Sequence, residues 1–152
     1  MADIDTDERY TLGPVLARCS SLAGVAAWDL DVAACADAHV ACRYYTKTDN
    51  GLLLPWAGRV WCNPPWSNIG PWVEKAWGEW HSGHIEALGM LLPATRTDIA
   101  WWQDLVEPQR DTPGSPLHVC FLPGRIQYGK PGDLLAAHQG TPAFGSVFLW
   151  WA

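Results

Sequence analysis

Four consecutive residues, Asn63-Pro64-Pro65-Trp66, combine the groups needed to hold and orient a planar amine. Asn63 carries an amide oxygen, and Pro64 has a backbone carbonyl but no N–H group. The two prolines fix their own φ angles, and Pro65 also restricts Pro64 to extended conformations, so the segment is rigid before a ligand binds. Trp66 adds a flat apolar ring. These four residues are therefore the candidate catalytic set, suited to a ring that bears an amino group.

The catalytic set follows a short apolar run, Val60-Trp61-Cys62, which predicts a buried β-strand. The strand must end at Asn63, because the prolines have no N–H to donate to a sheet. Taken alone, the segment is equally compatible with a proline turn beside a surface tryptophan.

An Asn-Pro-Pro-aromatic segment at the end of a strand resembles the catalytic motif of amino-methyltransferases that use S-adenosylmethionine. Further segments are similar, in order and spacing, to the small DNA N-6-adenine methyltransferases of phages and prophages, and the resemblance covers about residues 11–150. The segments include Asp29-Leu30-Asp31-Val32-Ala33-Ala34, Tyr44-Tyr45-Thr46, Asp49, Gly51-Leu52, Trp72-Val73-Glu74-Lys75-Ala76, Leu91-Leu92-Pro93-Ala94 and Arg96-Thr97-Asp98.

This resemblance implies a role for each member of the site. In the family, the Asn oxygen and the first Pro carbonyl accept hydrogen bonds from the target amine, and the aromatic ring stacks on the target. The resemblance also implies S-adenosylmethionine as cofactor, with contacts from Thr11, Asp31, Ala33, Tyr45, Thr46, Asp49 and Asn63. It implies a DNA substrate, for which the candidate contacts are Trp66, Ser67, Arg96 and Arg125.

Two positions depart from the family pattern. Many methyltransferases close their first strand with an acidic residue and a glycine-rich turn, whereas Asp31 is followed by Val32-Ala33-Ala34. A Thr-Pro step precedes the first helix in the family, whereas two residues separate Thr11 from Pro14. The resemblance implies that Asp31 holds the methionine ammonium, directly or through water; it is also placed to cap a helix that begins at Ala34.

The spacing of apolar residues predicts the elements that position the site. Strands alternating with helices, followed by an antiparallel end, predict a doubly wound, mostly parallel α/β sheet of the Rossmann-like methyltransferase kind. Expected strands cover residues 26–33, 60–62, 85–92, 117–122 and 146–151. Expected helices cover residues 15–22, 34 to about 42, 72–80 and 101–106, the last capped by Thr97 or Asp98. Residues 43–52 are expected to hold a polar turn, 125–128 a second strand arm, and 130–143 a lid or substrate loop.

The length and the net charge of the chain limit the partners that it can bind. The 152 residues predict one domain over residues 1–152, with a mobile acidic arm over residues 1–9. A net charge of −6 disfavours sequence-independent DNA binding by a basic surface, although a cleft needs only local positive charge. Candidates to supply that charge are Arg43, Lys47, Arg59, Arg96, Arg110, Arg125 and Lys130. With an acidic N-terminus and no membrane-length apolar run, we expect a soluble, cytoplasmic protein, in a bacterial host if phage-derived.

The five cysteines are scattered, which predicts reduced and mostly packed thiols. Cys35, His39 and Cys42 would share one face of the expected helix, as metal ligands do. Small buried residues on a helix explain the same spacing, and no fourth ligand is nearby, so we expect no metal.

The leading hypothesis is transfer of a methyl group from S-adenosylmethionine to the exocyclic N6 of a flipped adenine in DNA. One alternative is a methyltransferase that acts on RNA or on a protein glutamine amide. Another is a catalytically inactive relative that stacks nucleic-acid bases on Trp66 and neighbouring aromatic rings. The DNA recognition sequence and the oligomeric state do not follow from the residues.

Overall fold

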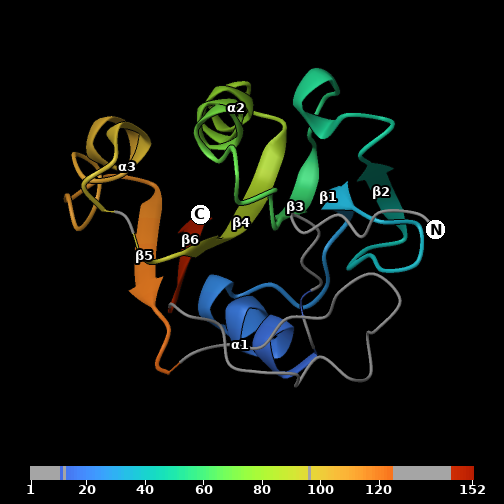
Figure 1. Cartoon of the computed structure of the whole chain (residues 1–152), viewed down its shortest axis with the longest axis horizontal. Coiled ribbons are helices and arrows are strands. Elements are labelled where there is room, and N and C mark those ends of the chain that lie inside the picture. Colours follow the sequence, from blue (N-terminus) through green and yellow to red (C-terminus); the bar gives the residue numbers. More distant parts are fainter. Residues whose placement is uncertain (1–10, 12, 96, 125–144) are drawn as a thin grey trace.

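A single β-sheet forms the centre of the molecule (Figure 1). The computed structural model describes residues 11, 13–95, 97–124 and 145–152. The arm expected over residues 1–9, the strand arm over 125–128 and the loop over 130–143 lie outside these residues. Within them the strands are β1 (Leu30–Ala34), β2 (Arg43–Thr46), β3 (Gly58–Cys62), β4 (Ile85–Pro93), β5 (Leu117–Phe121) and β6 (Ser146–Trp151).

The strand order creates a switch point beside β1. The order is β2-β1-β3-β4-β6-β5, in which β2, β1, β3 and β4 are parallel and β6 runs antiparallel between β4 and β5. The chain adds β2 on one side of β1 and β3 on the other. Open α/β sheets bind ligands outside the carboxyl ends of their strands at such a reversal. The expected mixed α/β fold, with a mostly parallel sheet and an antiparallel end, is confirmed.

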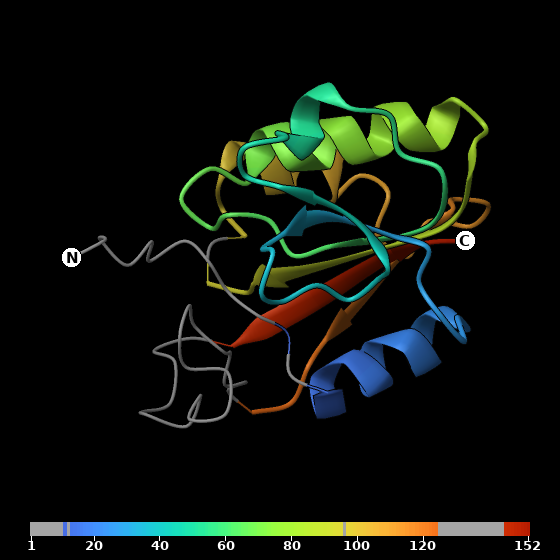
Figure 2. The same cartoon turned by 90° about the vertical axis from the view of Figure 1, so that its right-hand side faces the viewer.

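Helices cover both faces of the sheet (Figures 1 and 2). They are α1 (Gly13–Ala23), the 3₁₀ helix η1 (Gly51–Leu53), α2 (Gly70–His81) and α3 (Ala100–Leu105). α1 packs on one face, over a core that includes Trp28 and Trp61, and the other three lie on the opposite face, over Trp56, Trp72 and Trp102. Among the described helices, none has the length and apolar character that a membrane crossing requires.

α2 forms where the spacing predicts a helix. Trp72, Val73 and Ala76 are buried on its inner face, and a proline occupies its first turn, where a missing N–H is tolerated. The indole N–H of Trp77 donates to the Leu105 carbonyl at 2.8 Å, which fixes α2 against α3. These two helices therefore form one wall beside the end of β3.

The helix predicted over residues 34–42 is wrong. After β1 the chain makes a turn closed by a backbone bridge between Cys35 and Ala38. The carboxylate of Asp31 accepts a hydrogen bond from the Val40 N–H at 2.9 Å. Aspartate side chains that bond to nearby backbone in this way compete with helix formation, so Asp31 organises a loop and caps no helix.

Three smaller expectations also change. β1 is shorter than the predicted strand over residues 26–33. Residues 43–46, predicted as part of a polar turn, form the edge strand β2. α3 begins after Ile99, which makes no side-chain cap hydrogen bond, so neither Thr97 nor Asp98 is the cap residue.

Close backbone contact places η1 against β1. A Cβ atom added to Gly51 would lie 2.1 Å from the carbonyl oxygen of Val32, so the approach requires glycine. The indole N–H of Trp56 donates to the Gly51 carbonyl at 2.8 Å and fixes the position from the other side. The turn that precedes η1 is thereby held beside the carboxyl end of β1.

We predict that Gly51→Ala lowers the free energy of unfolding by about 2 kcal/mol or more, because the added Cβ would meet the Val32 backbone on one side and the Trp72 ring on another. Urea denaturation measures the change. Gly78→Ala is the matched control: Gly78 is exposed in α2 with nothing within 4 Å of the added Cβ, and alanine there should raise stability by about 1 kcal/mol. Equal stability of the two variants would contradict the close contact.

Candidate functional site

The Asn-Pro-Pro-Trp segment leaves the sheet at the switch point. β3 ends at Cys62, and the next residue, Asn63, begins the exit that the prolines enforce. On the neighbouring strand Asp31 pairs in register with Trp61, two residues before Asn63. The structure therefore brings the candidate catalytic amide and the candidate cofactor carboxylate to adjacent strands.

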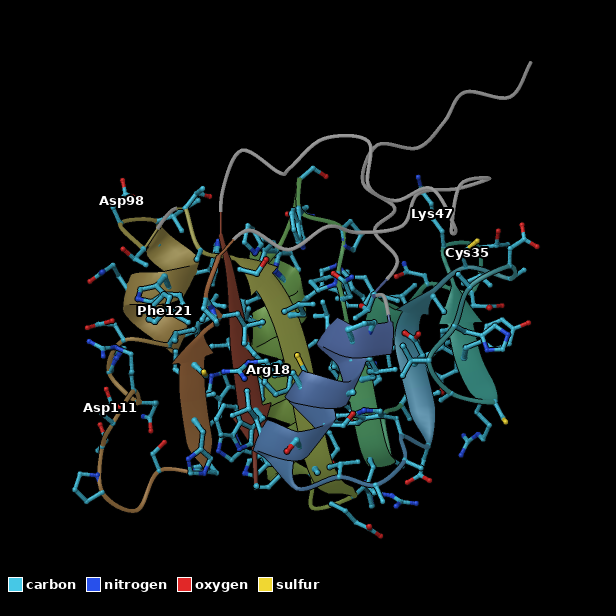
Figure 3. All side chains as sticks on the ribbon, turned by 90° about the horizontal axis from the view of Figure 1, so that it is seen from below. Arg18, Cys35, Lys47, Asp98, Asp111 and Phe121 are labelled. Carbon is cyan, nitrogen blue, oxygen red and sulfur yellow. The ribbon has the colours of Figure 1, made fainter. Side chains whose placement is uncertain are left out.

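Figure 3 shows where this site lies: at the edge of the sheet that is formed by the carboxyl ends of the parallel strands. Cys35 and Lys47 follow the carboxyl ends of β1 and β2, and Asp98 follows that of β4; all three lie toward the same edge, whereas Asp111 lies toward the opposite one. The start of β6 joins this edge, because the Ala94 N–H donates to the Gly145 carbonyl at 2.9 Å.

Asn63 is held by a residue far away in the sequence. The residue is 6% exposed, and its Nδ2 donates to the hydroxyl of Thr11 at 3.2 Å. This bond directs the amide nitrogen toward Thr11 and the amide oxygen the other way. Pro64 is buried and Pro65 is half-buried. The structure thus brings Thr11, a predicted cofactor residue, into contact with the catalytic set.

Trp66 lies at the border between the two cores and packs against both. Together with Ser67 it lines a cavity of about 600 Å³, which extends to Glu74 of α2 and to Trp101 and Asp104 of α3. The predicted substrate residues Trp66 and Ser67 therefore face one space. We call it the α2–α3 cavity.

Asp31 is a nearly buried carboxylate, 4% exposed, beside the end of β3. It accepts hydrogen bonds from the N–H groups of Ala33 at 3.3 Å and Val40 at 2.9 Å. These bonds order the loop after β1, at the position where many methyltransferases have a glycine-rich turn. Burial, and then the charge of Asp31, raise the pKa of the Cys62 thiol. The charge of Asp31 thus acts directly on the strand end that carries Asn63.

Tyr45, Thr46 and Asp49 all lie at or just after the end of β2, where Thr46 and Asp49 are joined by hydrogen bonds. The N–H and hydroxyl of Thr46 donate to Asp49 Oδ2 at 2.8 and 2.9 Å, and these bonds hold the pKa of the Asp49 carboxyl below its usual range. The Tyr45 hydroxyl donates to the Pro55 carbonyl at 2.8 Å, and its ring packs toward the α2 core. Thr46 pairs with Ala34 of β1, and Asp31 pairs with Tyr44, so these residues lie on the strand next to the one that carries Asp31.

Among the described basic residues considered for DNA binding, Lys47 lies toward this edge, whereas Arg59 and Arg110 are held elsewhere by ion pairs. Arg59, at the amino end of β3, makes a two-pronged ion pair with Asp29. Arg110 pairs with Glu107 and Asp111 beyond α3. The remaining predicted substrate residues, Arg96 and Arg125, lie outside the described residues, as does Lys130.

Sequence reasoning missed the part of the site that comes from α2 and α3. Trp101 and Asp104 are three residues apart on α3 and so share a face, which was the available signal.

The spacing of Cys35, His39 and Cys42, considered as a set of metal ligands, has a different explanation. His39 Nδ1 bonds to the Ala41 carbonyl at 2.7 Å, and its ring stacks on Tyr44. Within the described ranges no group of three or more His, Cys, Asp or Glu is arranged to hold a metal.

The mostly parallel sheet, the switch-point location and the Asn63-Pro64-Pro65-Trp66 exit are together consistent with a methyltransferase-like α/β fold. A family profile described as DNA N-6-adenine-methyltransferase (Dam) matches residues 15–151, nearly the whole chain. The chain belongs to this family. No curated protein and no solved structure matches it.

We predict that Asp31→Asn lowers the free energy of unfolding by about 2 kcal/mol, because an amide NH₂ would replace one of the two acceptors that face backbone N–H groups. Urea denaturation with wild-type protein alongside measures this. Asp37→Asn, an exposed change in the same loop, is the control and should alter stability by less than about 0.5 kcal/mol. If both variants unfold at the same urea concentration, the Asp31 bonds do not order the loop.

Proposed function

We propose that this protein transfers a methyl group from S-adenosylmethionine to the exocyclic N6 of adenine in DNA. The observation that carries the proposal is the position of Asn63-Pro64-Pro65-Trp66 at the carboxyl end of β3, one strand from the buried Asp31. Membership of the DNA N-6-adenine-methyltransferase family supports the acceptor. We further propose that residues 1–152 act as one domain of the Rossmann-like methyltransferase kind.

Two acceptors would hold the two hydrogens of the target amine. The Asn63 oxygen is one, and the Pro64 carbonyl is the other. With both N–H bonds so engaged, the nitrogen lone pair points out of the hydrogen-bonding plane, in the orientation that attack on a methyl group needs. Since the prolines and the Thr11 contact fix this geometry in advance, its contribution is mainly positioning and electrostatic preorganisation.

The residues beside the amine site fit the cofactor. A carboxylate as buried as Asp31 favours a cationic partner, and the methionine ammonium is one. Asp49, with Thr46, would accept from ribose hydroxyls, and Tyr45 and Ala33 would line the adenosine side. When bound, S-adenosylmethionine supplies an activated methyl group that leaves its sulfur for the amine nitrogen.

The site needs no strong base. The nitrogen of the product is acidic while it carries its extra positive charge, so its proton passes to water after transfer. The Cys62 thiol beside the motif stays protonated, because burial and then Asp31 raise its pKa.

The target base must leave the duplex to reach this site. Adenine N6 is paired and stacked in DNA, and extrusion costs about a few kcal/mol. Trp66 would offset part of this cost by stacking on the extruded base, since aromatic stacking contributes about 1–3 kcal/mol per base.

We predict that Asn63→Ala lowers kcat for DNA methylation by about a hundredfold or more, because one of two preorganised acceptors is lost. Tritium transfer from labelled S-adenosylmethionine to unmethylated DNA measures the rate. Calorimetric binding of S-adenosylhomocysteine and thermal unfolding show whether the variant keeps its cofactor site and fold. Gln109→Ala, an exposed amide beyond α3, serves as the control and should keep wild-type activity.

Full activity of Asn63→Ala would refute the assigned role. Parallel assays with RNA and protein acceptors test the acceptor class, and methylation of either in preference to DNA would overturn the proposal. Binding of nucleic acid without any binding of S-adenosylhomocysteine would identify an inactive relative instead.

A further inference from the structure

The α2–α3 cavity has the size of a small-molecule site, and only Trp66 of its lining has a role in the proposed methyl transfer. Its volume of about 600 Å³ lies within the range of small-molecule pockets. Both helices contribute to its walls, and the bond from the Trp77 indole to the Leu105 carbonyl fixes them against each other. The cavity is therefore a space that the packing of the two helices forms in advance.

Two carboxylates of the lining, Glu74 of α2 and Asp104 of α3, have no partner of opposite charge. Elsewhere in α2 the carboxylate of Glu79 is paired with Lys75. Within the described ranges neither Glu74 nor Asp104 makes an ion pair or a side-chain hydrogen bond, and no basic residue lines the cavity. The lining therefore carries uncompensated negative charge, which attracts a cation and repels phosphate.

The other walls favour a cation that carries a hydrocarbon chain. The rings of Trp66 and Trp101 and the side chains of Ile99 and Leu105 line the same space. Indole rings attract ammonium groups through cation–π contacts, and aliphatic side chains pack against methylene groups.

A metal ion fits this lining less well. Mg²⁺ and Ca²⁺ are held by several oxygen ligands that converge on one point. Among the residues that the structure describes, no group of three or more His, Cys, Asp or Glu is arranged to hold a metal. The apolar part of the lining would also contribute nothing to the binding of a bare ion. The cavity thus selects an organic cation.

We propose that the α2–α3 cavity binds a linear aliphatic polyamine of the spermidine class. Such amines are protonated at neutral pH, as a lysine side chain is. One ammonium group would pair with Glu74 and another with Asp104, while the methylene groups lie against the indole rings. The bound amine would bring positive charge to the site edge of a chain whose net charge is −6. Its binding requires neither DNA nor S-adenosylmethionine, so the site is independent of the proposed function.

Equilibrium dialysis of the intact protein against labelled spermidine, without DNA and at constant ionic strength, tests the inference. Wild-type protein should bind one spermidine and keep most of it in a large excess of Mg²⁺, because the metal gains nothing from the apolar walls. Asp104→Asn and Glu74→Gln should each weaken binding by about tenfold, since each removes one charge-assisted contact. Glu86→Gln is the control: it removes the same charge from an exposed position outside the cavity and should bind as the wild type does.

The aromatic contact is tested separately at Trp101. Trp101→Ala should weaken spermidine binding by about fivefold, and Trp101→Phe should keep most of it, since a phenyl ring also attracts cations. Thermal unfolding shows which variants are folded, and the two exposed carboxylate variants decide the result if Trp101→Ala is not. An absence of spermidine binding, its displacement by Mg²⁺, or equal weakening in Glu86→Gln would each overturn the inference; the last two would indicate diffuse attraction to an acidic surface.

Discussion

The geometry of the site follows from the point at which β3 has to stop. Two adjacent prolines cannot continue a ladder of N–H donors, so the chain leaves the sheet after Cys62 with little conformational freedom. The same loss of conformational freedom holds the Pro64 carbonyl, the Asn63 amide and the Trp66 indole ring at the carboxyl end of β3. Because β1 lies alongside β3 and in the same direction, its loop reaches that edge as well. A constraint of covalent geometry thus becomes a constraint on where a ligand can bind.

The elements with strong periodic patterns could be predicted from the sequence. β6 matches its expected bounds, 146–151, and α2 and β4 differ from theirs by only one or two residues at an end. The alanine-rich stretch after β1 was misread, because its intrinsic helix propensity is overridden by the bond from Val40 to Asp31. β2 was missed for a related reason: a short edge strand shows little burial, and its neighbouring turn residues dominated the pattern.

The residues of the candidate site could be proposed from the sequence, whereas their contacts could not. The Asn-Pro-Pro-Trp segment shows its chemistry directly, since rigidity and hydrogen-bonding capacity are properties of the residues themselves. The bond from Asn63 to Thr11 joins positions 52 residues apart, and the approach of Gly51 to Val32 depends on how η1 packs. Neither leaves a local trace in the sequence. The walls that α2 and α3 give to the cavity likewise depend on how two helices are set side by side.

The antiparallel strand β6 has a consequence for biogenesis. Its residues pair with β4 on one side and β5 on the other, and Val147, Phe148 and Leu149 are fully buried. During synthesis, β4 and β5 therefore have no partner between them until residues 146–151 emerge from the ribosome. The nascent chain exposes apolar strand edges until then, which makes it a natural client for chaperones. Translation that stops short of Ser146 would leave one edge of β4 and the whole of β5 without a pairing partner among the described strands.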